Sequence, residues 1–175
     1  EYVLLTPLQF HGKAITLKST AGAAATVLRM SPTPSSPARA SVVIFEDHET
    51  SASILDGFSL TGGQGTGIGG APPAGGGILC LGDASPTILR CRVEDNSAPE
   101  GGGLECRDAA SPAVAECVIH HNEGNGLRIL GSSRAVFRDC EVSSSSSHGV
   151  VARGTSSPRL IRCRVLENKG FAVDS

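Results

Sequence analysis

The sequence predicts an all-β fold in which one short unit repeats along the chain and stacks into a parallel β-solenoid. The main observation is a cysteine that recurs at spacings of 26, 23 and 23 residues, at Cys91, Cys117, Cys140 and Cys163. The chain of 175 residues also holds 22 Gly, 10 Pro and only 3% aromatic residues, which excludes a helical bundle or a coiled coil. A period in this range without an intervening helix is typical of stacked β-coils.

Each repeat predicts short strands with one buried face. An apolar residue stands three positions before each cysteine and another stands two positions after it, so apolar and polar residues alternate. Five positions after the cysteines the chain has Asn96, Asn122, Ser145 and Asn168. Because stacked coils lie about 4.8 Å apart, we expect the asparagines to bond to one another at a sharp corner and to adopt left-handed backbone angles there.

The repeat is clear over residues 75–175 and less regular over 1–74, and we treat 1–175 as one β-helix domain. In the N-terminal part we expect strands at 14–17 and 41–45, and a weaker repeat over 54–63 in which Phe58 takes the cysteine position. Residues 32–37 and 64–76 are expected to be loops, and 143–147 a locally loose turn. A last coil without a cap predicts that the native chain continues past Ser175.

The glycines of residues 65–70 formally match a dinucleotide-binding fingerprint. That fingerprint needs a helix directly after it, whereas Ala71-Pro72-Pro73 follows here and cannot begin one. We therefore interpret the segment as a flexible glycine loop.

The segments 75–80, 85–91 and 93–96 resemble the right-handed parallel β-helix repeats of pectin-lyase-like proteins. The resemblance covers residues 75–175 and implies a right-handed parallel β-helix of about six or seven coils, each adding about 4.8 Å. It implies little about activity, because this solenoid carries lyases, hydrolases, epimerases, adhesins and binding domains. An extracellular or cell-surface location follows from the resemblance alone.

The six cysteines include no Cys-x-x-Cys pair, and their spacing follows the coil period. We expect one inward column of Cys91, Cys117, Cys140 and Cys163 and a second of Cys80 and Cys106. Buried free thiols pack as small apolar groups, and parallel side chains have poor disulfide geometry. A disulfide or a metal site is the alternative interpretation.

Charged residues beside the cysteines point outward if the cysteines point inward. The candidate site residues are Glu116, Asp139, Glu141, Arg162 and Arg164, of which the three acids are the candidate Ca²⁺ ligands. Polysaccharide lyases of this fold resemble that arrangement, with calcium-binding acids on the outer face and an arginine as the base. The alternative is a charge ladder that pairs Arg90–Glu116, Asp139–Arg162 and Glu141–Arg164 across coils.

Composition limits the classes of partner. The 15 basic and 17 acidic residues give a net charge of −2, so no basic excess favours nucleic acid, and no apolar stretch is long enough to span a membrane. His120 and His121 precede the Asn122 corner and are expected to be solvated, with a metal or acid–base role as the alternative.

These observations predict a non-catalytic β-helix module of an extracellular or surface protein that presents a face to a polysaccharide or a protein partner. The lack of a complete catalytic constellation favours this function, while the scarcity of Trp and Tyr argues against sugar stacking. The alternative is a fragment of a polysaccharide lyase or hydrolase with a pectin-lyase-like fold. A third hypothesis is an assembly element that associates end to end through unpaired strands. No cofactor is expected, apart from Ca²⁺ in the lyase hypothesis.

Overall fold

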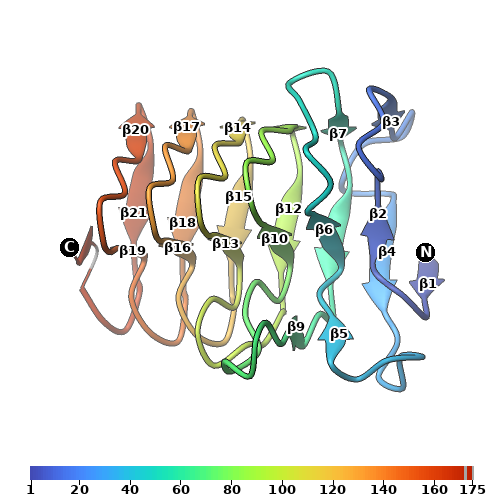
Figure 1. Ribbon diagram of the computed structural model, residues 1–175, viewed down its shortest axis with the longest axis horizontal. Helices are drawn as coiled ribbons and strands as arrows, with labels where there is room; N and C mark the ends of the chain where they lie inside the picture. The colour runs from blue at the N-terminus through green and yellow to red at the C-terminus, as the bar shows by residue number, and fades with distance from the viewer. Residues whose placement is uncertain (172, 175) are drawn as a thin grey trace.

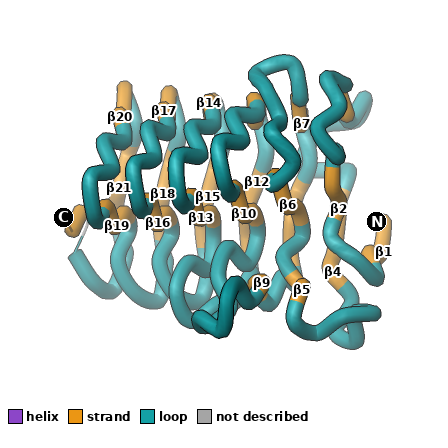
Figure 2. Tube along the Cα trace, in the orientation of Figure 1, coloured by secondary structure: helices purple, strands orange, loops and turns teal. Residues whose placement is uncertain are grey.

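The computed structural model describes residues 1–171 and 173–174. Short strands and turns wind in successive coils along one axis, with the N-terminus at one end of the stack and the C-terminus at the other (Figure 1). This part of the chain contains no helix, and loops make up most of the path between the strands (Figure 2). Equivalent strands of successive coils pair in parallel, so the predicted parallel β-helix is confirmed.

Three parallel sheets form the walls of the solenoid. Sheet A contains β1 (Tyr2–Leu4), β4 (Val27–Met30), β8 (Ser59–Thr61), β12 (Arg92–Glu94), β15 (Val118–His120), β18 (Glu141–Ser143) and β21 (Arg164–Leu166). Sheet B contains β2 (Leu8–Gln9), β6 (Val43–Phe45), β10 (Ile78–Cys80), β13 (Leu104–Cys106), β16 (Leu127–Ile129), β19 (Val150–Ala152) and β22 (Val173–Asp174). Sheet C contains β3 (Thr16–Lys18), β7 (Ile54–Asp56), β11 (Thr87–Leu89), β14 (Ala113–Ala115), β17 (Val136–Arg138) and β20 (Arg159–Ile161).

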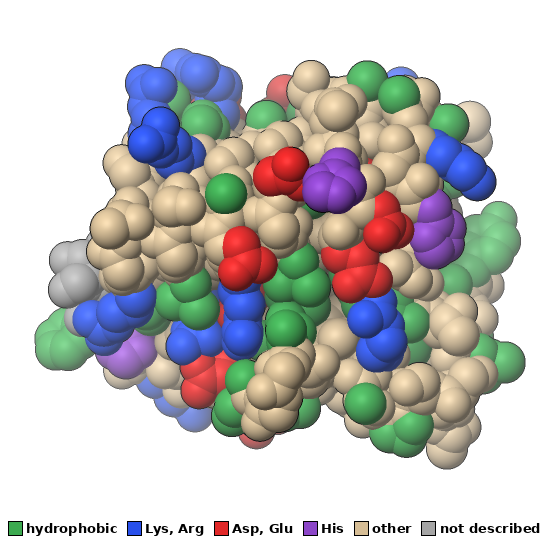
Figure 3. Space-filling model, viewed as in Figure 1, with side chains coloured by type: hydrophobic (Ala, Val, Ile, Leu, Met, Phe, Trp, Pro, Cys, Tyr) green, Lys and Arg blue, Asp and Glu red, His purple; other side chains and the backbone are tan. Residues whose placement is uncertain are grey.

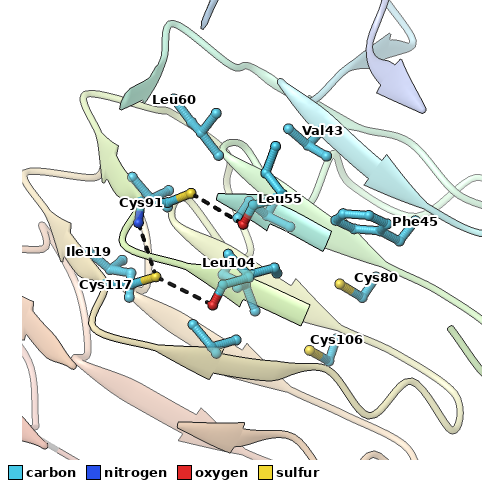
Figure 4. Close-up of a cluster of buried hydrophobic side chains, with 14 of the residues drawn as sticks. Val43, Phe45, Leu55, Leu60, Cys80, Cys91, Leu104, Cys106, Cys117 and Ile119 are labelled. Carbon is cyan, nitrogen blue, oxygen red and sulfur yellow. Dashed lines mark hydrogen bonds between the residues drawn. The ribbon is translucent and has the colours of Figure 1, made fainter. Parts of the chain in front are cut away.

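The cysteines lie in the two inward columns that the sequence predicts. Cys91, Cys117 and Cys140 are at most 3% exposed, and Cys163 in the last coil is half-buried. The backbone N–H of Cys91 donates to Sγ of Cys117 over 3.4 Å (Figure 4). Cys80 pairs in register with Cys106 and both are fully buried. All six thiols are free, so they pack as apolar groups of the core.

Burial also affects the ionisation of these thiols. Burial raises the pKa of the Cys106 thiol well above its ordinary value of 9.0, because a thiolate in the apolar interior would lose its hydration. The thiols of Cys91 and Cys117 also donate to the backbone carbonyls of Leu89 and Ala115, each over 3.2 Å. The cysteine column therefore both fills the interior and caps carbonyl groups at the corner between sheets C and A.

The asparagine ladder is present, but the position of its left-handed residue differs from the expectation. Asn96 and Asn122 are each 1% exposed, and the amide of Asn96 donates to Oδ1 of Asn122 over 3.1 Å. The positive φ falls on the preceding residue, 54° at Asp95 and 52° at His121. That residue makes the turn so that the asparagine side chain can reach inward and bond to backbone carbonyls.

A second corner of each coil lies directly before the cysteine. Its residues have left-handed φ angles of 48–55°, at Arg90, Glu116, Asp139 and Arg162. The sharp turn sends the side chain of this residue outward and that of the following cysteine inward. The candidate charged residues are thus placed on the outside by the same turn that forms the core.

Glycine is needed where the chain enters the strands of sheet B. A Cβ atom on Gly103 would lie 2.3 Å from the carbonyl oxygen of Gly126 and 2.7 Å from Cγ2 of Ile119. Those distances are shorter than van der Waals contact, so neighbouring coils approach closely there only without a side chain.

The irregular segments match the expectations in part. Residues 64–76 form a loop without a helix, but Gly65–Thr66 is a short strand, β9, that pairs antiparallel with β5 (Arg39–Ala40). The expected loose turn at 143–147 differs in part, because Ser143 is the last residue of β18 and Ser145 at the centre of the segment is only 1% exposed. Ser145 occupies the asparagine position of the ladder, so it is packed by the coils on either side.

Candidate functional site

The five candidate residues lie together on the outer surface. They line a shallow groove of about 330 Å³ at the corner between sheets C and A, which we call the corner groove; it is lined by Glu116, Cys117, Val118, Asp139, Cys140, Glu141, Arg162 and Arg164. The left-handed corner supplies Glu116, Asp139 and Arg162, and the first residues of β18 and β21 supply Glu141 and Arg164. Three successive coils therefore build one groove, and its chemical role stays a prediction.

Asp139 and Arg162 form the most regular ion pair of the groove. Nε and Nη2 of Arg162 lie 2.6 Å from Oδ1 and Oδ2 of Asp139, which is a bidentate contact between neighbouring coils. The hydrogen bond from Arg162 and its positive charge lower the pKa of Asp139, and the same carboxylate raises the pKa of Arg162. Both groups are therefore ionised at neutral pH.

Glu141 and Arg164 form a second, looser pair. Their backbones are in register on β18 and β21, and Nη1 of Arg164 lies 3.3 Å from Oε2 of Glu141. The hydroxyl of Ser143 donates to the other oxygen of Glu141 over 3.1 Å. The Arg164 side chain is 71% exposed, so it retains donors that face solvent.

The third pair of the predicted ladder, Arg90 with Glu116, is wrong. Nη2 of Arg90 instead lies 2.5 Å from Oδ2 of Asp56, one coil earlier, and Nζ of Lys18 lies 3.7 Å from the same oxygen. The Asp56 side chain is only 6% exposed and therefore needs a cationic partner more than the exposed Glu116 does. Glu116 forms no ion pair with any described residue.

The arginines decide what the groove can do with a cation. They neutralise Asp139 and Glu141, the carboxylates that a Ca²⁺ ion would need. Within residues 1–171 and 173–174 no group of three or more His, Cys, Asp or Glu side chains is arranged to hold a metal ion. Calcium binding by Glu116, Asp139 and Glu141 remains a prediction, which a titration of the protein with Ca²⁺ can test.

A second polar cluster lies on the outer face of sheet A and was not predicted. Glu94 at the end of β12 contacts Arg92 at 3.2 Å and His120 of the next coil at 2.8 Å, and it accepts a hydrogen bond from Ser59. Burial acts to raise the pKa of Glu94, but the hydrogen bonds and the nearby positive charges outweigh it and lower that pKa. The 26-residue spacing of Glu94 and His120 was the available signal, because it equals the coil period.

A third cluster lies on sheet B, where acidic and basic side chains meet on the face drawn in Figure 3. Glu105 in the middle of β13 is fully buried and contacts Arg107 and Arg128, while Arg128 also pairs with Glu100. The Oε2 atom of Glu105 has no hydrogen-bond partner among the described residues. Burial raises the pKa of Glu105 despite both arginines. The alternation of residues along β13 predicts that the side chain of Glu105 points outward. It does not predict that a loop covers this side chain.

Comparisons with known proteins identify the fold family and no closer relative. No helix in the described part of the chain is long and apolar enough to cross a membrane. A search of curated proteins and a search of solved structures each gave no significant match. A family model described as a right-handed β-helix region matches residues 76–175, which is more than half of the chain. The chain therefore belongs to the right-handed β-helix family.

Proposed function

We propose that this β-helix is a binding module whose ligand surface is the outer face of sheet A together with the corner groove. The observation that carries the proposal is an in-register row of four positions that crosses successive coils on one side of the sheet. Three of them carry charged side chains, Arg92, Glu141 and Arg164, and the fourth is Val118. A rigid face that repeats at the coil spacing of about 4.8 Å is suited to an extended polymer.

The chemistry of the groove favours an acidic polysaccharide as the ligand. The side chains of Arg162 and Arg164 are 64% and 71% exposed, so the guanidinium N–H groups that do not bond to Asp139 and Glu141 can donate to the carboxylate of a uronate sugar. The unpaired carboxylate of Glu116 can accept hydrogen bonds from sugar hydroxyl groups. Recognition would thus rest on hydrogen bonds and ion pairs in place of aromatic stacking.

Such a ligand implies that the module acts outside the cell or on its surface, where acidic polysaccharides are displayed. The free thiols are compatible with this proposal, because most of them face the core and not the solvent. Localisation of the tagged protein after cell fractionation tests this part of the proposal.

Titration calorimetry with oligogalacturonate and with alginate oligosaccharides tests the binding function. We expect binding that weakens with rising salt and that falls about tenfold in Arg162→Gln and Arg164→Gln. Arg159→Gln is the matched control, since Arg159 is an exposed arginine of the same coil on sheet C. Absence of binding to both polymers, or an equal loss in the control, would contradict the proposal.

A second candidate function is lyase or hydrolase activity at the same groove, and the free carboxylate of Glu116 favours it. Among the acids that line the groove, Glu116 is the one without an ion pair to a described arginine, so its carboxylate is the one available to transfer a proton. Absorbance of unsaturated uronate products on pectate and alginate, with and without Ca²⁺, distinguishes this activity from simple binding. Product formation that Glu116→Gln abolishes would favour the enzyme.

A further inference from the structure

Two adjacent histidines at the end of β15 have an arrangement that the proposed binding function does not use. The Nδ1 atoms of His120 and His121 face each other at 2.5 Å. The two rings meet nearly edge to face, with centroids 4.8 Å apart and planes inclined by 72°. We call these residues the histidine pair.

Glu94 determines which nitrogen of His120 carries the proton. Its Oε2 atom lies 2.8 Å from Nε2 of His120, and Nη2 of Arg92 lies 3.3 Å from the same nitrogen. An arginine N–H can only donate and a carboxylate can only accept, so the shorter contact assigns the ring proton to Nε2. The Nδ1 atom of His120 is then an unprotonated nitrogen that points at His121.

We propose that the histidine pair binds a divalent transition-metal ion of the Zn²⁺ class through its two Nδ1 atoms. Imidazole nitrogen is a preferred ligand of such ions. A histidine that ligates a metal commonly donates its other N–H to a carboxylate, and Glu94 occupies that position. Arg92 at 3.2 Å and Ser59 hold Glu94 in turn, so the supporting contacts are built into the sheet.

The geometry needs only a small change to accept the ion. Zn–N bonds of about 2.0–2.1 Å in a tetrahedral site place two ligand nitrogens about 3.3 Å apart, which is less than 1 Å more than the present separation. His121 is exposed and can turn its ring outward by that amount, while His120 is held by Glu94. No third His, Cys, Asp or Glu completes the set within the described residues, so water or a ligand oxygen fills the open positions.

Around the pair, the carboxylates of Glu94 and Asp95 outnumber the guanidinium of Arg92, so the local charge favours a cation. Asp95 occupies the corner position of His121 one coil earlier, since Glu94 and His120 are in register. Asp95 is exposed and forms no ion pair with a described residue, so its negative charge is not neutralised nearby. None of the contacts that carry the inference requires a bound polysaccharide, although Arg92 belongs both to the proposed ligand row and to the support of Glu94.

Calorimetric titration of the metal-free full chain with Zn²⁺ tests the proposal, with the visible absorption of bound Co²⁺ as a second readout. We expect one ion per chain, a loss of at least tenfold in affinity in His121→Asn, and a loss of about 10–100-fold in Glu94→Gln. Asn tolerates the left-handed φ of 52° at this position, so His121→Asn retains the corner.

Two control variants separate the histidine pair from other metal ligands. His48→Asn removes an exposed corner histidine with φ of 61°, whose Nδ1 lies 2.6 Å from Asp83, and Cys163→Ser removes the least buried thiol. Both should bind Zn²⁺ as the wild type does. Absence of Zn²⁺ binding, wild-type affinity in His121→Asn, or loss of binding in either control would overturn the proposal.

Discussion

Asn96 and Asn122 lie 26 positions apart in the sequence, yet the side-chain amide of Asn96 donates to Oδ1 of Asn122 over 3.1 Å. Oδ1 of Asn122 also accepts the backbone N–H of Asn96, and Nδ2 of Asn122 donates to the carbonyls of Val93 and His120. One buried side chain therefore satisfies polar groups of two coils. This relationship fixes the register on which the outer surface of sheet A depends.

Replacing Asn122 by Ala should lower the free energy of unfolding by about 2–4 kcal/mol, because it leaves buried donors and acceptors of two coils without partners. Urea denaturation measures this change. Asn168→Ala is the comparison, since Asn168 is half-buried in the last coil and should cost less. A cost for Asn122→Ala below that of Asn168→Ala would show that the ladder does not stabilise the stack.

Replacing Ser145 by Asn should raise the free energy of unfolding by about 1 kcal/mol. The hydroxyl of Ser145 is buried without a hydrogen-bond partner among the described residues, whereas an asparagine there would extend the ladder from Asn122 to Asn168. Gly126 faces this position as Gly103 faces Asn122, so the longer side chain has room. Thermal and urea denaturation of Ser145→Asn check the prediction, and a destabilised variant would contradict it.

The interior and the register could be predicted from the sequence because both depend on periodicity. The columns of Cys117 and Asn122 follow directly from residues that recur at the coil spacing. The partner of Arg90 could not be predicted in this way. It pairs with Asp56 of a coil where the repeat is weak, and the choice depends on the burial of that carboxylate.

The sequence likewise predicted which residues form the candidate site, but it did not predict which side chains contact one another. The outward corner positions brought Asp139, Arg162 and the other groove residues together. The buried Glu105 was missed, because alternation along a strand shows which side chains point outward but not which of them a loop covers. The Glu94–His120 contact was missed although the 26-residue spacing equals the coil period, because the repeat shows which residues are neighbours across coils but not which side-chain atoms meet.

The thiols should differ in reactivity according to burial. In the native protein we expect Cys163 to react first with a colorimetric disulfide reagent, because it is the least buried thiol even though burial raises its pKa, and we expect all six to react in denaturant. Cys163→Ser should remove the fast phase without changing the slow one. Rapid reaction of Cys106 or Cys117 in the native protein would contradict the inward cysteine columns, because both thiols are buried and their pKa values are raised well above 9.0.

The buried carboxyl of Glu105 should make stability depend on pH. Its pKa in the folded state is raised above the ordinary value of 4.5 by burial, although Arg107 and Arg128 oppose the shift and Glu100 adds to it. The folded state thus binds more protons than the unfolded state between 4.5 and the raised pKa, so the stability contribution of Glu105 is greatest below 4.5 and falls as pH rises through that window.

Comparison with Glu105→Gln isolates this dependence, because the amide does not titrate. The free energy of unfolding of the wild type relative to Glu105→Gln should fall as pH rises through the window above 4.5, because the buried carboxyl is less stable once it is ionised. Urea denaturation at a series of pH values measures the difference. If the wild type instead became more stable relative to Glu105→Gln as pH rises, the arginines would lower the pKa of Glu105 overall, and the prediction would be contradicted.

The most direct test of the proposed ligand surface is a heteronuclear NMR titration of the labelled protein with oligogalacturonate. We predict that shift changes concentrate on the corner groove and the outer row of sheet A, at Val118, Glu141 and Arg164, and that sheets B and C stay unchanged. Changes confined to another sheet, or none at saturating ligand, would contradict the assignment of this surface.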